Sequence, residues 1–355
     1  MRITSRAKLR GLALALALAP SMVLSAHAEE KQSGNREIYL YQGADRAQSL
    51  LSQAKKEGGL TLYTTMTLED SMPLIEAFEK KYRVKVTMWR ALNQKVVQRA
   101  LAEARAGKHV VDAFEGSGPG MEILYRENLL EKFYSPAFND IPPAAFPRHG
   151  YYAPDNFLFF VMGYNTKLVK PDQVPNTYED LLRPQWTGNL GIEASDIIWF
   201  AAVAKAMGEE KGLAYFQKLA AMKPQVRSGH TLLAELVASG EIPIGLTLYN
   251  QGVERLKDKG APIAWKPLPP AFGRTDGIGV AKQAPHPHAA LLFVDFVLSE
   301  EGQQIIKARN RVPVSRLVDS PFNKFDYRII DLAALLDEWD TWEKRWQTLF
   351  LQGRK

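Results

Sequence analysis

The chain has 355 residues, of which 46% are hydrophobic, and a formal net charge of +6. The first 28 residues carry four basic and no acidic side chains, so the remainder is nearly neutral at +2 and gives no electrostatic case for binding nucleic acid. The sequence contains no cysteine, which excludes disulfides, thiolate sites and a lipidated N-terminal cysteine.

The N-terminus has the pattern of an export signal. Basic residues within 1–10 precede an apolar run, and Ala26-His27-Ala28 provides the small-x-small pattern of a cleavage site. Because the run is short and contains Pro20, we expect a secretory signal and not a membrane span. We therefore predict cleavage after Ala28 and a soluble protein in the periplasm. The ~327 residues that remain exceed what one compact core usually holds, so two lobes are expected.

Strands and helices alternate from residue 60 onward. Hydrophobic periodicity predicts strands over 60–66, 84–89 and 110–114, with helices over 71–82 and 94–108 between them. Short connections between alternating strands and helices indicate an α/β fold with a mixed, mostly parallel sheet and right-handed crossovers.

A stretch rich in proline and aromatic residues then interrupts this rhythm. Residues 151–165 are expected to form strands that carry the chain into a second lobe, followed by helices near 197–207, 209–222 and 230–241. A short buried strand follows over 244–248.

A proline-rich return crossing over 265–287 leads to a helix–turn–helix over 288–314 and a long amphipathic helix over 329–350. The predicted organisation is a signal (1–28), a leader (29–57), a first lobe (58–150 and 270–320), a second lobe (151–269) and a C-terminal helical segment (321–355).

Polar side chains follow the first and third predicted strands. Thr64 and Thr65 end the first strand, Ser117 and Gly118 open the helix after the third, and Arg90 ends the second. Free backbone N–H groups and hydroxyls at such positions suit a carboxylate or phosphate, although an ordinary turn is an equally good interpretation. Because the carboxyl ends of parallel strands share an edge, these side chains together favour a ligand cleft.

The segment "PIGLTLYNQGVERL" (243–256) ends a second-lobe strand with Tyr249 and Asn250. We interpret this tip as the second lobe's contribution to the cleft. Core packing is the alternative for the aromatic candidates and solvent exposure for the arginines. The remaining candidates for ligand binding are Tyr152, Ser195, Trp199 and Arg227.

Motifs for chemistry are weak. The six histidines form no helical metal-binding pair, and "HPH" (286–288) suits a helix start, so neither a metal nor another cofactor is expected. "EGSGPG" (115–120) resembles a nucleophile elbow only loosely. No catalytic residue is assigned, and an exported α/β hydrolase stays open as an alternative.

Several segments resemble the periplasmic solute-binding proteins of ABC importers, in the branch that includes ferric-iron-binding proteins. The residues that carry the resemblance, over about 58–315, include "VVDAFEGSG", "PNTYEDLLRPQWTGNLGI" and "KQAPHPHAALLFVDFVLSEEGQQII". The resemblance implies a two-lobed type 2 periplasmic binding fold that closes on a ligand at the hinge. It also implies a monomer that delivers its ligand to an inner-membrane permease and performs no chemistry.

The ligand does not follow from the resemblance. Iron-binding members carry adjacent tyrosines before an arginine-leucine pair, and matching that pair to Arg255-Leu256 places Gln251 and Gly252 at those positions. The histidine and glutamate of some members fall near Thr67 and Ser117. Because ferric iron prefers anionic oxygen ligands, we predict a small polar, anionic organic solute, with ferric iron or a ferric complex as the alternative.

Overall fold

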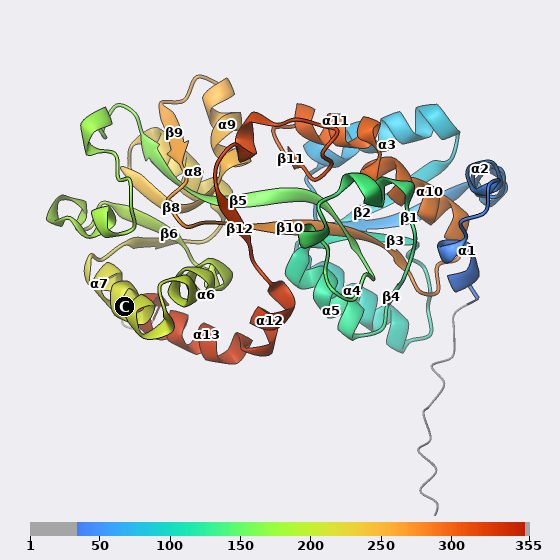
Figure 1. Ribbon diagram of the computed structural model, residues 1–355, viewed down its shortest axis with the longest axis horizontal. Helices are drawn as coiled ribbons and strands as arrows, with labels where there is room; N and C mark the ends of the chain where they lie inside the picture. Colours follow the sequence, from blue (N-terminus) through green and yellow to red (C-terminus); the bar gives the residue numbers. More distant parts are fainter. Residues whose placement is uncertain (1–33, 352–355) are drawn as a thin grey trace, which may run out of the picture. The chain divides into compact units, whose positions relative to one another are not determined.

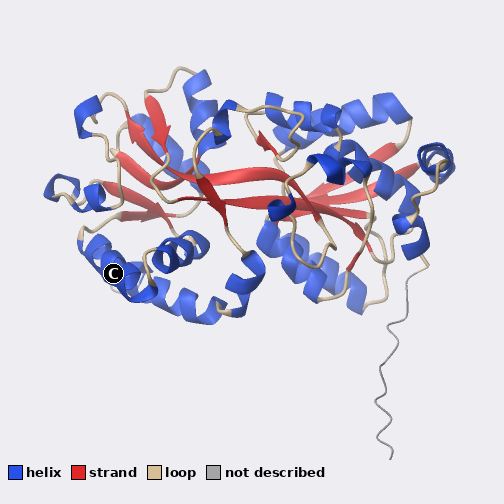
Figure 2. Cartoon of the chain, in the orientation of Figure 1, coloured by secondary structure: helices blue, strands red, loops and turns tan. Residues whose placement is uncertain are grey.

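The computed structural model describes residues 34–351, so the predicted signal peptide and its cleavage site lie outside the described residues. Within this range, 12 strands form one sheet whose main order is β2-β1-β3-β10-β5-β8-β6-β7, with helices on both faces (Figures 1 and 2). The strands are Gly59–Thr64 (β1), Lys85–Arg90 (β2), Ala113–Ser117 (β3), Leu130–Glu131 (β4), Ala153–Asn165 (β5), Leu190–Glu193 (β6), Gln225–Arg227 (β7), Ile244–Tyr249 (β8), Ile263–Lys266 (β9), Ala271–Ala281 (β10), Val312–Pro313 (β11) and Tyr327–Ile329 (β12).

The helices occupy most of the sequence between the strands. No helix among residues 34–351 combines the length and apolar character needed to cross a membrane. The α-helices are Arg36–Leu40 (α1), Arg46–Glu57 (α2), Leu68–Tyr82 (α3), Asn93–Arg105 (α4), Gly118–Arg126 (α5), Ile197–Ala206 (α6), Glu209–Ala221 (α7), His230–Ser239 (α8), Asn250–Asp258 (α9), Pro287–Leu298 (α10), Glu300–Ala308 (α11), Leu332–Asp337 (α12) and Trp339–Trp346 (α13).

Two long antiparallel strands, β5 and β10, form the centre of the sheet and run side by side through both halves of the structure in Figure 1. Every residue of β10 is buried, and β5 is buried over nearly its whole length, because other strands and helices cover them on all sides. We call the elements on the β1–β3 side, with α3–α5, the first lobe. Those on the β6–β8 side, with α6–α9, are the second lobe.

Parallel pairing brings the strand ends together as expected. In the first lobe β1 pairs in parallel with β2 and β3, and in the second lobe β6 pairs in parallel with β7 and β8. Thr64 therefore lies opposite both Arg90 and Glu115 at the carboxyl edge of the first lobe. The predicted mixed α/β fold class is confirmed, and the predicted domain boundaries stay predictions.

One predicted strand differs in its bounds. The third strand begins at Ala113 and not at residue 110, although the Asp112 backbone still donates to the Thr61 carbonyl and accepts from the Ala281 N–H. The Asp112 carboxylate also accepts hydrogen bonds from the backbone N–H groups of Thr61 and His286. The helix α5 ends at Arg126, and β4 follows within "LLEKF" (129–133). A short 3-10 helix occupies Glu179–Leu182.

The C-terminal segment (residues 321–351) is not the single long helix that its Leu/Trp periodicity predicts. It begins with a 3-10 helix over Pro321–Asn323 and continues with β12, which pairs with β10. Its helix is interrupted at Glu338 between α12 and α13. The Leu/Trp stripe is nonetheless buried as an amphipathic pattern requires. Trp342 and Trp346 lie in the same hydrophobic cluster as α6 and α7 of the second lobe.

Candidate functional site

The first lobe's strand ends converge on one buried carboxylate, Glu115. The Thr64 hydroxyl donates to its Oε2, and the backbone N–H groups of Thr65 and Met66 donate to the same atom at 3.1 and 3.0 Å. Its Oε1 has no hydrogen-bond partner among the described residues. Burial raises the pKa of Glu115, and the nearby Asp276 carboxylate raises it further. Thr64, predicted to face a ligand, therefore serves this internal contact.

Ser117 and Gly118 lie at the N-terminus of α5, where the Ser117 hydroxyl makes no capping hydrogen bond. A Cβ atom on Gly118 would come within 2.8 Å of the Thr275 carbonyl oxygen and would also meet the Leu332 side chain. Leu332 begins α12, which packs against α5. The strand tip predicted to bind an anion is thus bordered by the C-terminal segment.

Tyr249 connects the second lobe to the central strands. It ends β8, and its hydroxyl accepts a hydrogen bond of 3.3 Å from the Arg274 guanidinium on β10. Arg274 also donates to Asp276 two residues further along the strand. The Tyr249 ring centroid lies 4.1 Å from that of His230, and burial raises the pKa of the Tyr249 phenol.

Beside Tyr249, the second-lobe loops place acidic side chains around His230. The His230 Nε2 atom lies 3.4 Å from Asp196 Oδ1, while Glu193 accepts hydrogen bonds from the backbone and hydroxyl of Ser195 at 2.6 and 2.7 Å. Burial lowers the pKa of His230 to about 4 and, with the charge of Glu193, raises the pKa of Asp196. Ser195, a predicted site residue, is exposed and positions Glu193.

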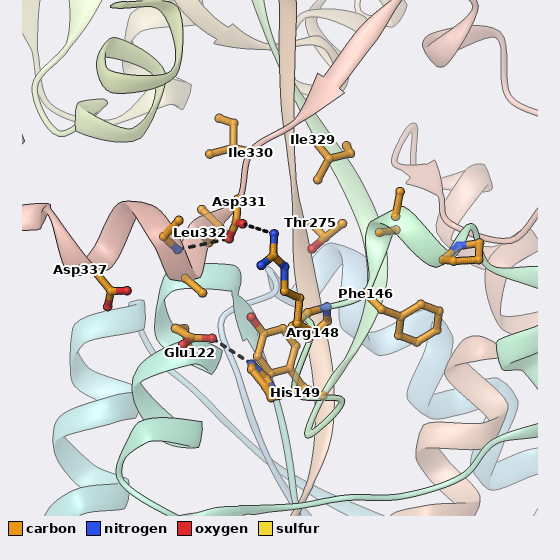
Figure 3. Close-up of a pocket in the computed structure, with 17 residues that line it drawn as sticks. Glu122, Phe146, Arg148, His149, Thr275, Ile329, Ile330, Asp331, Leu332 and Asp337 are labelled. Carbon is orange, nitrogen blue, oxygen red and sulfur yellow. Dashed lines mark hydrogen bonds and ion pairs between the residues drawn. The ribbon is translucent and has the colours of Figure 1, made fainter. Parts of the chain in front are cut away.

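A cavity of about 490 Å³ lies between the first lobe and the C-terminal segment (Figure 3). Tyr152, predicted to line the cleft, borders it, and Glu122 binds His149 at 3.0 Å on its wall. Figure 3 shows Arg148 facing Asp331, with which it forms an ion pair of 3.6 Å. The cavity is lined by Glu122, Pro143, Ala144, Ala145, Phe146, Pro147, Arg148, His149, Tyr152, Thr275, Ile329, Ile330, Asp331, Leu332, Ala333, Ala334 and Asp337.

The other predicted residues do not join these groups. The Asn250 amide donates to the Phe322 carbonyl at 2.9 Å, and Trp199 is 2% exposed in the second-lobe core. Arg90 is exposed at the end of β2, and Arg227 hydrogen-bonds along its own strand. Their roles in ligand binding stay predictions.

An ion-pair network lies at the lobe junction, and the sequence does not predict it. Asp70 of α3 binds Arg255 of α9 at 2.9 Å and Arg311 at 3.0 Å, and Arg311 lies 3.6 Å from Asp276. The four side chains come from positions up to 241 residues apart, so no local pattern could have indicated the network.

The comparisons with known proteins agree on one family. A family model described as a bacterial extracellular solute-binding protein matches residues 73–321. The Fe(3+)-binding periplasmic protein of Serratia marcescens is 24% identical over 267 residues, covering 72% of this chain and 78% of the relative. Iron uptake protein A1 of Synechocystis sp. is 33% identical over 185 residues, covering 46% of this chain and 49% of the relative.

Solved structures share the fold. Iron-bound HitA from Pseudomonas aeruginosa superposes with a TM-score of 0.72 at 21% identity, covering 81% of this chain and 99% of HitA. AfuA from Actinobacillus pleuropneumoniae, with fructose-6-phosphate bound, superposes with a TM-score of 0.71 at 23% identity, covering 83% of this chain and 99% of AfuA. The type 2 periplasmic binding fold is thereby confirmed.

Proposed function

The chain belongs to the bacterial extracellular solute-binding protein family, and we propose that it captures a small anionic organic solute and delivers it to an inner-membrane ABC permease. The proposed solute carries a carboxylate, phosphonate or sugar-phosphate-like group. In this proposal the mature protein begins after Ala28, acts as a monomer in the periplasm, closes its lobes about β5 and β10, and does not transform the solute.

The pairing of Arg274 with Tyr249 carries this proposal. The guanidinium lies at the lobe junction with its position set by Asp276, while its hydrogen bond to the Tyr249 hydroxyl is long at 3.3 Å. An anionic oxygen of a solute offers a guanidinium a stronger, charge-assisted partner than a phenol does. The Ser117 hydroxyl at the α5 N-terminus makes no capping hydrogen bond and adds a neutral donor from the first lobe.

Ferric iron is the alternative that the names of several relatives favour. This chain offers one phenol, Tyr249, at the tip where Gln251 and Gly252 occupy the positions matched to tyrosines. Because burial raises the pKa of Tyr249, forming the phenolate that ferric iron prefers is unfavourable. AfuA, a relative with a sugar phosphate bound, supports the organic solute.

Native mass spectrometry of freshly purified protein, followed by denaturation, tests the proposal by identifying any small molecule that co-purifies. We expect an intact organic anion. Tyr249→Phe and Ser117→Ala should each weaken its binding roughly tenfold, the loss of one hydrogen bond to a charged group. Tyr164→Phe is the matched control and should bind normally, because Tyr164 pairs with Ile244 at the end of β8 opposite to Tyr249.

Two outcomes would contradict this function. A coloured, iron-loaded protein without an organic anion would favour the ferric alternative. Conversion of the recovered ligand by the protein over hours would favour the exported hydrolase.

A further inference from the structure

Three side chains from two parts of the second lobe bring metal-ligand atoms together beside Tyr249. Glu193 ends β6, Asp196 directly precedes α6, and His230 is the first residue of α8. One ligand atom from each lies within 4.8 Å of the other two. None of the histidines forms a pair at helical spacing, so the sequence predicts no metal site, and these three residues meet only through the fold.

The hydrogen bond on one side of the His230 ring determines which nitrogen is free. Nδ1 lies 2.9 Å from the Thr247 carbonyl oxygen, which can only accept, so Nδ1 carries the proton. Nε2 then carries no proton, and its lone pair faces Asp196 Oδ1 at 3.4 Å. Histidines that bind metals commonly donate their second ring N–H to a backbone carbonyl in this way.

Asp196 supplies an independent observation. Its residue is only 3% exposed, yet its Oδ2 has no hydrogen-bond partner among the described residues. Although Asp196 occupies the N-cap position of α6, its side chain makes no capping hydrogen bond. The Thr247 side chain hydrogen-bonds to Asp196, but the buried Oδ2 atom keeps no partner, and a buried carboxylate oxygen normally has one.

Glu193 is held in a fixed orientation by the loops around it. Ser195 donates to one of its oxygens, and the backbone N–H of Gly229 donates to the other at 2.9 Å. Oε1 accepts one hydrogen bond and keeps a lone pair for a metal ion, whereas Oε2 already accepts two. Hydrogen bonds of this kind orient the ligands of metal sites.

We propose that Glu193, Asp196 and His230 bind one divalent first-row transition-metal ion. One imidazole and two carboxylates suit Zn²⁺, Mn²⁺ and Fe²⁺ better than Ca²⁺ or Mg²⁺, which prefer oxygen ligands alone. Metal ligands lie about 2 Å from a bound ion, so the three side chains need to move only slightly toward one another. The His230 side chain is 25% exposed, so the ion can enter from solvent.

The Tyr249 hydroxyl is outside this ligand set because it accepts from Arg274. Three protein ligands leave further coordination positions, which water or an anionic oxygen of a solute could fill. The metal site does not depend on which solute the protein carries.

Calorimetric titration of metal-free protein with Zn²⁺ alone and with Mn²⁺ alone tests the site, with the thermal midpoint as a second readout. We expect one ion per chain and a raised midpoint for at least one of the two metals. His230→Ala and Asp196→Asn should each weaken binding by at least ~100-fold. His288→Ala is the matched control, since its side chain is 24% exposed and faces a single carboxylate, Glu57.

Wild-type protein that binds neither ion overturns the proposal, whatever the variants do. Undiminished binding by folded His230→Ala and Asp196→Asn, with folding checked by circular dichroism, also overturns it. An organic solute found by native mass spectrometry in protein that binds no metal would remove this site and leave the proposed function standing.

Discussion

The two lobes end their strands in chemically different ways. In the first lobe Glu115 is enclosed by its own neighbours, with Thr64 donating to it, and Leu332 covers Gly118 at the start of α5. In the second lobe His230 and Asp196 face each other as acceptors, and the histidine is partly open to solvent. The first lobe therefore encloses its strand-end carboxylate, whereas the second lobe leaves an imidazole and a carboxylate without a donor between them.

The C-terminal segment connects these two surfaces. Trp342 and Trp346 pack in the second-lobe core, and the Trp346 indole N–H donates to the Ala194 carbonyl at 2.8 Å. On the other side, Arg126 of α5 binds Asp337 at 2.8 Å. The segment thus has a buried apolar attachment to the second lobe and a mainly polar, exposed attachment to the first.

The largest loss of stability is expected from Trp346→Ala, which removes one of the segment's apolar contacts with the second lobe. Trp346 is 1% exposed and packs against Phe200, so its truncation should lower the free energy of unfolding by about 3–5 kcal/mol. Urea denaturation measures the loss. Trp339→Ala, a partly buried tryptophan of the same segment, is the control. Equal losses in the two variants would show that the segment is not anchored in the second-lobe core.

A smaller effect is expected at Asp70, whose carboxylate joins the lobes through Arg255 and Arg311. Asp70→Asn keeps the shape but leaves both arginines without this negative charge. We expect the free energy of unfolding to fall by about 1.5–3 kcal/mol at pH 7, the range for hydrogen bonds to charged groups.

The pH dependence of Asp70→Asn has a definite sign. Burial acts to raise the pKa of Asp70, but Arg311 and Arg255 outweigh it and the pKa is lowered. The stabilisation is therefore present above the unfolded pKa of about 3.9 and is lost as pH falls through the lower folded value. Wild type and variant should converge in acid. A difference in unfolding free energy between wild type and variant that stays unchanged down to pH 2 would contradict the ion-pair interpretation. The variant Asp319→Asn, at an exposed carboxylate, is the control.

Local patterns were sufficient to predict most of the fold. The strand ending at Tyr249 and the α5 start at Gly118 follow from apolar runs, prolines and glycines that act over a few residues. The C-terminal helix was predicted in one piece because its apolar stripe continues past Glu338, where only tertiary contacts reveal the interruption.

The candidate site was less accessible to sequence reasoning. The sequence places Arg274 in a proline-rich crossing, whereas in the structure it contacts Tyr249, 25 residues away in the chain. The sequence predicts for His230 only that it starts a helix. Side chains that meet across strands leave no periodic signal in the sequence, so the contacts at the lobe junction become visible only in the structure. A single strand end such as Ser117 can be predicted from the sequence alone.

Two glycines give the smallest and sharpest test of the difference between the lobes. A Cβ on Gly118 would meet the Thr275 carbonyl at 2.8 Å, so Gly118→Ala should cost about 1–3 kcal/mol through overpacking. Gly252, inside α9, has nothing within 4 Å of the corresponding position, and Gly252→Ala should stabilise the protein by up to ~1 kcal/mol through helix propensity. Thermal unfolding of both variants measures the contrast. If Gly118→Ala were neutral, the close contact between α5, β10 and the C-terminal segment would not persist in solution, and the first lobe's strand end would be as open as the second's.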